Sequence, residues 1–250
     1  MKMKFIDSMG LRVFSDDLRK IELDRPNKLI LTISPNSYGM ATKDTFFRES
    51  LENTDYLVLD GVYFGLAAFF LHGKSIKRNQ GPDLFDYYIK KMDEMSGRVF
   101  FLGSTEETLG KIKERASLLY PNVHVGTYSP PFKPVFSEND NSKMIEQINS
   151  FKPDIVFVGM TAPKQEKWGY ENKDRIDAKL TCCVGAVFDW FAGNEKTIPK
   201  IWWKLRLAWL IRTINRPEVL KRYPSVGIFF WHLLLVLLRI KNEKTIGRCL

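Results

Sequence analysis

The 250-residue sequence contains little cysteine and little histidine, with three residues of each. The cysteines, of which Cys182 and Cys183 are adjacent, cannot form a disulfide framework and lack the spacing of zinc ligands. The histidines are scattered, which favours neither a metal cluster nor a Ser-His-Asp arrangement. These residues therefore indicate no zinc site, and we expect no cofactor. We interpret Cys182 and Cys183 as small apolar residues of a buried strand.

Several short motifs are also missing. The sequence has no G-x-G-x-x-G, no P-loop lysine pattern and no D-x-D. These absences argue against the usual dinucleotide and NTPase sites and against the usual metal-diphosphate bridge. The first 14 residues have no apolar run after their lysines. We therefore expect no secretory signal and a start in the cytosol.

The charge is unevenly distributed along the chain. Residues 1–195 carry 26 Lys and Arg against 27 Asp and Glu, whereas residues 196–250 carry 12 against 2. The last 55 residues therefore supply essentially all of the net charge of +9. We predict two parts, a nearly neutral body at 1–195 and a basic C-terminal appendage at 196–250.

Short apolar runs alternate with amphipathic stretches of helical length. The pattern predicts strands at 29–33, 56–59, 99–102, 123–126, 155–158 and 180–184. It predicts helices near 41–51, 62–71, 82–95, 106–119, 139–150, 163–175 and 186–192. Strands separated by helices indicate an α/β fold with a mostly parallel sheet and helices on both faces, because parallel neighbours need crossover connections.

Short polar or glycine-bearing turns follow five of the predicted strands. They are Ser34-Pro35-Asn36, Asp60-Gly61, Gly103-Ser104-Thr105, the stretch from Gly159 to Pro163, and Gly185-Ala186. Ligands of open α/β sheets bind at the carboxyl ends of the strands, so we expect these turns to converge on one rim. Two turns have structural alternatives: the first can be a routine loop around Asn36, and Ser104 can form a helix-capping box with Glu107.

Asp60 stands out among these residues because it directly follows the apolar strand at 56–59. A carboxylate at the carboxyl end of a buried strand can act as a general base if it points into the cleft. The alternative is that Asp60 caps the next helix or closes a turn. The dipeptide alone does not decide between the two.

Two further segments place polar side chains at predicted helix starts. The stretch from Arg78 to Asp83 puts a cation and Gly81 before a helix, which suits either a diphosphate or a plain solvated helix entry. Pro163 can occupy the first turn of the next such helix, which would aim Lys164 and Gln165 at the cleft to bind phosphate and sugar hydroxyls. An exposed charged helix face is the alternative there.

The appendage mixes tryptophan, leucine and basic residues. Residues 201–214 have the pattern of a basic, tryptophan-rich amphipathic helix. Residues 226–240 form a 15-residue run in which only His232 and Arg239 interrupt the apolar character. About 20 residues are needed to span a bilayer, so we expect this run to lie in the membrane interface. An exposed apolar tail also leaves association into a homo-oligomer open.

In this order, the motifs resemble those of the WecG/TagA/CpsF family of bacterial glycosyltransferases, over residues 29–222. The specific parts are Ala-Pro-Lys-Gln-Glu at 162–166 and Phe188-Asp189 with Ala192-Gly193. Lys167-Trp168 and Gly185-Ala186-Val187, which adjoin them, also carry the resemblance. The other residues that carry the resemblance are Thr32 with Ser34-Pro35-Asn36, Asp60-Gly61, Arg78 with Gly81, Asp83 and Leu84, and Leu207 and Trp209 with Arg212.

The resemblance implies a Rossmann-like core and an inverting transfer, without a metal, of a hexose or N-acetylhexosamine-type sugar from a UDP-sugar to a polyprenyl-diphosphate-linked acceptor. It implies that Asp60 is the catalytic base and that Thr32 and Gln165 line the pocket. It also implies that the appendage, with Arg212 and Arg222, closes over the site and meets the membrane. The remaining candidate substrate-binding residues are Ser34, Asn36, Gly61, Arg78, Gly81, Asp83, Gly103, Gly159, Pro163, Lys164, Gly185 and Asp189.

Two other classes of protein agree less well with the sequence. A tail that carries +10 with tryptophans suits a nucleic-acid-binding module, but such a module has no use for the apolar run at 226–240. An NAD-dependent oxidoreductase conflicts with the missing glycine motif. We therefore predict a UDP-sugar donor, a polyprenyl-diphosphate-linked acceptor and an anionic membrane surface as partners, and no nucleic acid. The expected location is peripheral, on the cytoplasmic face of the bacterial inner membrane.

Overall fold

The computed structural model describes residues 3–194 and 217–247. Six strands form the main sheet in the order β4-β3-β8-β7-β5-β6, and every pairing in it is parallel. The strands are β3 (Lys28–Ile33), β4 (Tyr56–Leu59), β5 (Arg98–Gly103), β6 (His124–Tyr128), β7 (Ile155–Gly159) and β8 (Leu180–Cys183). The predicted parallel α/β sheet is therefore confirmed.

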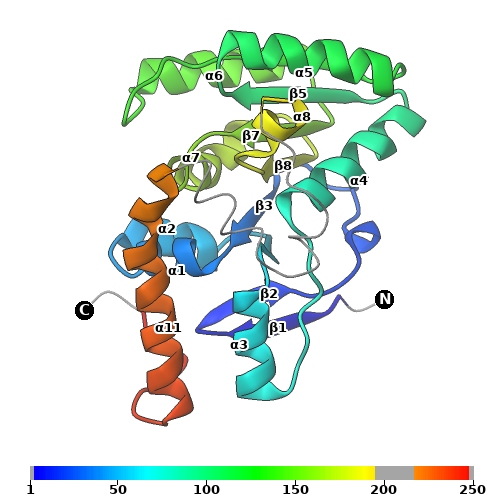
Figure 1. The fold of residues 1–250 in the computed structure, drawn as a ribbon. Helices are drawn as coiled ribbons and strands as arrows, with labels where there is room; N and C mark the ends of the chain where they lie inside the picture. Colours follow the sequence, from blue (N-terminus) through cyan, green and yellow to red (C-terminus); the bar gives the residue numbers. More distant parts are fainter. Residues whose placement is uncertain (1–2, 195–216, 248–250) are drawn as a thin grey trace.

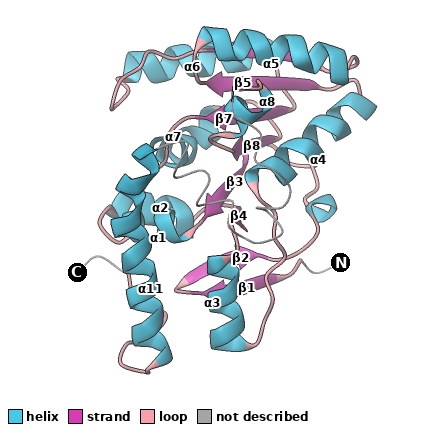
Figure 2. Ribbon diagram, viewed as in Figure 1, coloured by secondary structure: helices cyan, strands magenta, loops and turns pink. Residues whose placement is uncertain are grey.

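Helices cover both faces of this sheet (Figure 2). Side chains of β3 alternate between two cores, with Leu29 and Leu31 in one and Ile30 in the other. The first core also contains residues of α1 (Pro35–Ala41), α2 (Thr45–Glu52), α3 (Tyr63–His72), α6 (Glu138–Phe151) and α7 (Lys164–Asn172). The second contains residues of α4 (Gly81–Glu94), α5 (Glu106–Leu119) and α8 (Val187–Phe191).

One predicted helix is wrong in its bounds. The single helix expected near 41–51 is two helices, α1 and α2, separated by residues 42–44. Ser34 caps α1 with Pro35 in its first turn, and the Asp44 carboxylate accepts the Phe47 N–H at 2.9 Å to start α2. The polar turn expected at Ser34 to Asn36 is thus the start of a helix, because serine followed by proline favours helix initiation.

A short antiparallel hairpin precedes the sheet and was not predicted. It consists of β1 (Phe5–Ser8) and β2 (Leu11–Phe14), joined at Met9 and Gly10, whose φ angles are 52° and 73°. Two successive positive φ angles are typical of a tight hairpin turn. The hairpin contacts the end of the main sheet through Phe14, whose ring lies 5.4 Å from that of Tyr56.

The C-terminal helix α11 (Tyr223–Leu237) packs along α1 (Figure 1). Phe229 and Leu233 are buried in the first core, and the Tyr38 hydroxyl lies 3.1 Å from Nδ1 of His232. The described residues include no helix that is both long and apolar enough to cross a bilayer. The basic segment at 201–214 lies outside the described residues, so the predicted division into a body and an appendage stays a prediction.

Candidate functional site

The five predicted turns lie along one edge of the sheet. All six strands are parallel, so the carboxyl ends of β4, β3, β8, β7 and β5 follow one another along that edge. The backbone N–H of Asp60 donates to Ile33 at 2.9 Å, and that of Val184 donates to Val158 at 3.0 Å, so the ladder continues to the last residues of these strands. The predicted convergence on one rim is confirmed.

Asp60 is half-buried at this rim. Val62, rather than Asp60, occupies the N-cap of α3. Burial, and to a smaller extent the charge of Asp60, raises the pKa of the Glu166 carboxyl group, so the two carboxyl groups interact electrostatically. Gly61 follows in the left-handed region, with a φ of 82°. The Asp60 backbone therefore lies at the strand-end rim, and the role of its carboxylate as a base stays a prediction.

Ser34, Asn36 and Thr32 stand at or near the end of the adjacent strand β3. The Ser34 hydroxyl takes part in the capping box with Ser37, accepting its N–H at 3.3 Å. Nδ2 of Asn36 lies 3.4 Å from Sδ of Met40, also within α1. Thr32 is half-buried on β3. Ser34 and Asn36 therefore have local partners, and their contact with a substrate stays a prediction, as does that of Thr32.

The start of α4 reaches the same rim. A Cβ on Gly81 would lie 3.2 Å from the carbonyl oxygen of Val184 just after β8, so the start of α4 approaches the end of β8 closely and glycine fits there without a shift of its neighbours. The Asp83 carboxylate accepts the Gln80 N–H at 2.9 Å and caps the helix. Arg78 is exposed just before it. These residues place a helix N-terminus and a cation at the end of β8.

The glycines at the ends of β5 and β7 have a packing role. A Cβ on Gly103 would lie 2.4 Å from the carbonyl oxygen of Gly159, and one on Gly159 would lie 2.4 Å from the ring of Phe188. The capping box predicted for Ser104 and Glu107 is wrong, because Thr105 is the N-cap of α5. A role for these glycines in binding a nucleotide stays a prediction.

The segment at 162–168 supplies the rim with Gln165. Its Oε1 accepts the Met160 N–H at 3.1 Å and its Nε2 donates to Oε1 of Glu166 at 2.8 Å. A Cβ on Gly185 would lie 3.5 Å from Nε2 of Gln165, so this carboxamide spans the ends of β7 and β8. The helix itself is anchored by Trp168, whose indole N–H donates to Oδ1 of Asn141 at 3.0 Å.

Pro163 and Lys164, which precede Gln165, were also predicted to lie at the cleft. Pro163 occupies the N-cap of α7. The Lys164 ammonium donates to the Lys133 carbonyl oxygen and lies 3.7 Å from the centre of the Phe136 ring, and its partial burial lowers its pKa. Lys164 therefore contacts the loop that follows β6, and its predicted role toward phosphate stays a prediction.

The remaining candidates are spread more widely. Asp189 lies in the first turn of α8, half-buried. Arg222 is exposed at the junction between the short helix Pro217–Arg222 and α11. Arg212 lies outside the described residues. No cluster of three or more metal-ligating side chains occurs among residues 3–194 and 217–247.

One feature of the site was not predicted from the sequence. Glu166 is a buried carboxyl group that is 2% exposed, whereas its charged neighbours suggested an exposed helix face. The available signal was Trp168, a large apolar side chain two residues after Glu166. The prediction for Cys182 and Cys183 is confirmed: both are buried residues of β8, and burial raises the pKa of both thiols.

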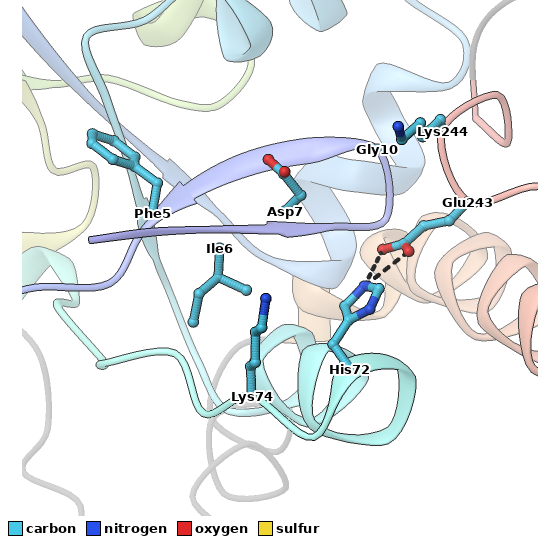
Figure 3. A pocket seen from close by; sticks show the side chains of 8 residues that line it. All are labelled: Phe5, Ile6, Asp7, Gly10, His72, Lys74, Glu243 and Lys244. Carbon is cyan, nitrogen blue, oxygen red and sulfur yellow. Dashed lines mark hydrogen bonds and ion pairs between the residues drawn. The ribbon is translucent and has the colours of Figure 1, made fainter. Parts of the chain in front are cut away.

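A separate cavity of about 260 Å³ lies between the hairpin, the end of α3 and the C-terminal segment (Figure 3). Glu243 accepts the Met9 N–H at 2.6 Å and faces Nε2 of His72 at 2.9 Å. Lys74 and Lys244 also line it. None of the predicted site residues belongs to this cavity, which instead ties the C-terminal segment to the N-terminal hairpin.

The fold and the rim define an α/β enzyme with its polar residues gathered at the carboxyl ends of parallel strands. Residues 4–244 match the model of the glycosyl transferase WecG/TagA/CpsF family, and the chain belongs to that family. It is a glycosyltransferase.

Named relatives come from Staphylococcus aureus. Proteins of strains MRSA252, MW2 and NCTC 8325 are each called N-acetylglucosaminyldiphosphoundecaprenol N-acetyl-beta-D-mannosaminyltransferase. Each is 28% identical to this chain over 218 residues, which cover 87% of the chain and 84% of the relative.

Proposed function

We propose that this enzyme transfers a hexose or N-acetylhexosamine-type sugar from a UDP-sugar to a polyprenyl-diphosphate-linked sugar, with inversion, in the synthesis of a bacterial surface polysaccharide. The family and the names of the relatives support this substrate class. The observation that carries the proposal is the position of Asp60, half-buried at the strand-end rim beside the pair Gln165 and Glu166. Family membership argues against the alternative of a nucleic-acid-binding module.

Asp60 acts as the general base in this proposal. Its carboxylate takes the proton of the acceptor hydroxyl while the hydroxyl oxygen forms a bond to the anomeric carbon. The bond from that carbon to the UDP oxygen breaks at the same time, and its electron pair leaves with UDP. Attack from the face opposite UDP inverts the anomeric centre.

The charge that develops on UDP needs positive partners. α4 begins at Gly81, where backbone N–H groups favour an anion, and Arg78 is exposed three residues before it. In the proposal, both stabilise the departing UDP. Arg212 and Arg222 of the appendage complete this set in the proposal. With these groups, the transfer proceeds without a divalent ion.

Release of UDP tests the proposal. We expect purified enzyme in detergent to release UDP from one member of a panel of UDP-hexoses and UDP-N-acetylhexosamines. The release should require a short polyprenyl-diphosphate sugar and should persist in EDTA. Loss of activity in EDTA, restored by Mg²⁺ or Mn²⁺, would contradict transfer without a metal. An absence of acceptor-dependent release with every donor would contradict the substrate class.

The proposal also includes peripheral attachment to an anionic membrane. Apolar side chains are exposed on two helices that contact each other, α3 and α11 (Figure 1). The rings of Tyr63 and Phe230 lie 5.8 Å apart, and those of Phe64 and Phe229 lie 5.4 Å apart. The exposed side chains are Phe69 and Phe70 of α3, Phe230, Trp231, Leu234 and Leu237 of α11, and Leu238 and Ile240 just after it.

Basic residues flank this apolar surface. Lys74 follows α3, and Arg239, Lys241 and Lys244 follow α11, all four exposed. Apolar side chains between lysines and arginines match a bilayer that contains anionic lipid, because the chains enter the interface while the cations meet headgroup phosphates. The enzyme would thereby meet an acceptor whose lipid is anchored in the same bilayer.

Vesicle binding tests whether this apolar surface binds membranes more strongly than exposed apolar side chains elsewhere on the protein. Changing Phe69 and Phe70 to serine should weaken binding to phosphatidylglycerol–phosphatidylethanolamine vesicles roughly tenfold or more, because each phenylalanine contributes ~1.5–3 kcal/mol on burial. The matched control replaces Leu118 and Leu119 of α5 with serine, another adjacent exposed apolar pair. Cosedimentation measures both. Equal vesicle binding by the two double variants would contradict the proposal that α3 and α11 form the membrane-binding surface.

A further inference from the structure

Glu166 lies at the transfer site with an unusual environment for a carboxyl group. It is 2% exposed, in the first turn of α7. Its Oε1 accepts a hydrogen bond from Gln165 at 2.8 Å. Its Oε2 is buried and has no hydrogen-bond partner among the described residues. A buried carboxylate with an unpaired oxygen is strongly disfavoured, whereas a neutral acid is tolerated far better.

No cation among the described residues compensates for this burial. The two nearest lysines of α7 are engaged elsewhere, Lys164 with the loop carbonyl of Lys133 and Lys167 in an ion pair with Asp44 at 2.8 Å. Salt bridges in the described part of the chain do not include Glu166.

The groups that face Glu166 from neighbouring elements also favour its neutral form. Asp60 lies beyond β4 and the Cys183 thiol lies on β8, and both interact with Glu166 electrostatically. β7, which packs against α7, contains no ionisable residue, and the one in β3, Lys28, pairs with Asp24 at 2.5 Å. α2 also packs against α7 and carries Arg48, Glu49 and Glu52. Arg48 pairs with Glu52 at 2.7 Å, and Glu49 accepts a hydrogen bond from Tyr170 at 3.2 Å. Burial first, and the Asp60 charge in addition, raise the pKa of Glu166 to about 7.

Gln165 is held in one orientation by its two neighbours. The Met160 N–H can only donate, so it requires Oε1 of Gln165, and Nε2 must then point toward Glu166. One hydrogen of this Nε2 is used by Glu166. The other is the group that the carboxamide can offer to a ligand beside Gly185.

We propose that Glu166 is a positioning residue of the transfer site, which holds the Gln165 carboxamide at the rim and does so as a neutral acid, so that no second negative charge opposes Asp60. This inference rests on the proposed function for its effect on catalysis. The neutral state of Glu166 is a property of the folded protein and is measured without any substrate.

Two variants separate the roles. Glu166→Leu removes the acceptor of the Gln165 hydrogen bond, and Glu166→Gln keeps an acceptor and is always neutral. We expect Glu166→Leu to lower kcat/KM about tenfold or more, mainly through the KM of the UDP-sugar, because it leaves a buried N–H unpaired. Glu166→Gln should restore most of that loss. Equal kcat/KM for the two variants would overturn the positioning role.

Thermal unfolding of the full chain tests the neutral state. A carboxyl group whose pKa rises on folding contributes stability that is complete below its unfolded pKa and is lost as the pH rises toward the folded value. Between pH 4.5 and pH 8, the Tm of the wild type should therefore fall by roughly 4 °C or more relative to that of Glu166→Gln. In an Asp60→Asn background this difference should shrink. Parallel curves for wild type and Glu166→Gln would overturn the neutral state even if sugar transfer is observed, and an enzyme with no transfer but diverging curves would fail only the proposed function.

Discussion

Replacing Asp60 with asparagine should lower kcat by about 10²–10⁴-fold, the range that a positioned general base contributes. The substitution keeps the shape of the side chain but removes its ability to accept the hydroxyl proton. The Asp60 backbone N–H, which donates to Ile33, is unaffected, so the strand end should stay in place. The measurement is acceptor-dependent UDP release at saturating donor.

Asp55→Asn is the matched control for this result. Asp55 precedes the same strand, β4, at its opposite end, and its carboxylate accepts the Leu29 N–H at 2.9 Å. Asparagine retains an oxygen for that bond, so kcat should stay within about twofold. A similar loss in both variants would point to the stability of β4, and an active Asp60→Asn would assign the base to another residue.

Gly39→Ala should undock α11 from α1. A Cβ on Gly39 would lie 1.9 Å from the Ser225 carbonyl oxygen and 2.5 Å from its carbon, so a backbone must move. Both atoms belong to backbone rather than to a flexible side chain, and overpacking of this kind costs about 1–3 kcal/mol or more. We expect faster amide hydrogen exchange throughout α11 and exposure of Phe229, which is now fully buried.

Gly227→Ala, within α11 itself, provides the comparison. A Cβ on Gly227 would meet no atom within 4 Å. Alanine is a better helix former than glycine by about 1 kcal/mol, so this variant should leave exchange in α11 unchanged or slower. Faster amide exchange in Gly227→Ala, or an unchanged exchange rate in Gly39→Ala, would show that the close approach of Gly39 to Ser225 does not hold α11 against α1.

The parallel sheet could be predicted because its signals are local. Strands such as Ile155–Gly159 are buried on both faces, and such strands are continuous apolar runs that end at a glycine or polar residue. The hairpin could not be predicted in this way, because its strands have four residues each and its apolar contact is with the distant Tyr56. Its turn at Met9 and Gly10 was the available clue.

The residues of the candidate site also differ in whether a local sequence signal predicts them. Asp60 could be predicted because its place directly after a strand fixes where its backbone lies. Glu166 could not, since the charged residues around it suggest a solvated helix face. Its burial depends on contacts of α7 with α2 and β3, which lie far earlier in the sequence, and with β8, which comes later in the chain.

The place of β8 in the sheet governs how the chain can be assembled. In hydrogen-bond order, β8 is the strand that joins the pair β4-β3 to the group β7-β5-β6. During synthesis, β3 therefore leaves the ribosome about 150 residues before β8, the strand that pairs with it on the side away from β4. Contacts between segments so far apart in sequence form slowly. Until residue 183 has emerged, the half-sheet β4-β3 and the half-sheet β7-β5-β6 each have an open edge, at β3 and at β7. The half-sheet that carries Asp60 is therefore joined to the half-sheet that carries Gly159 only when β8 pairs with both β3 and β7.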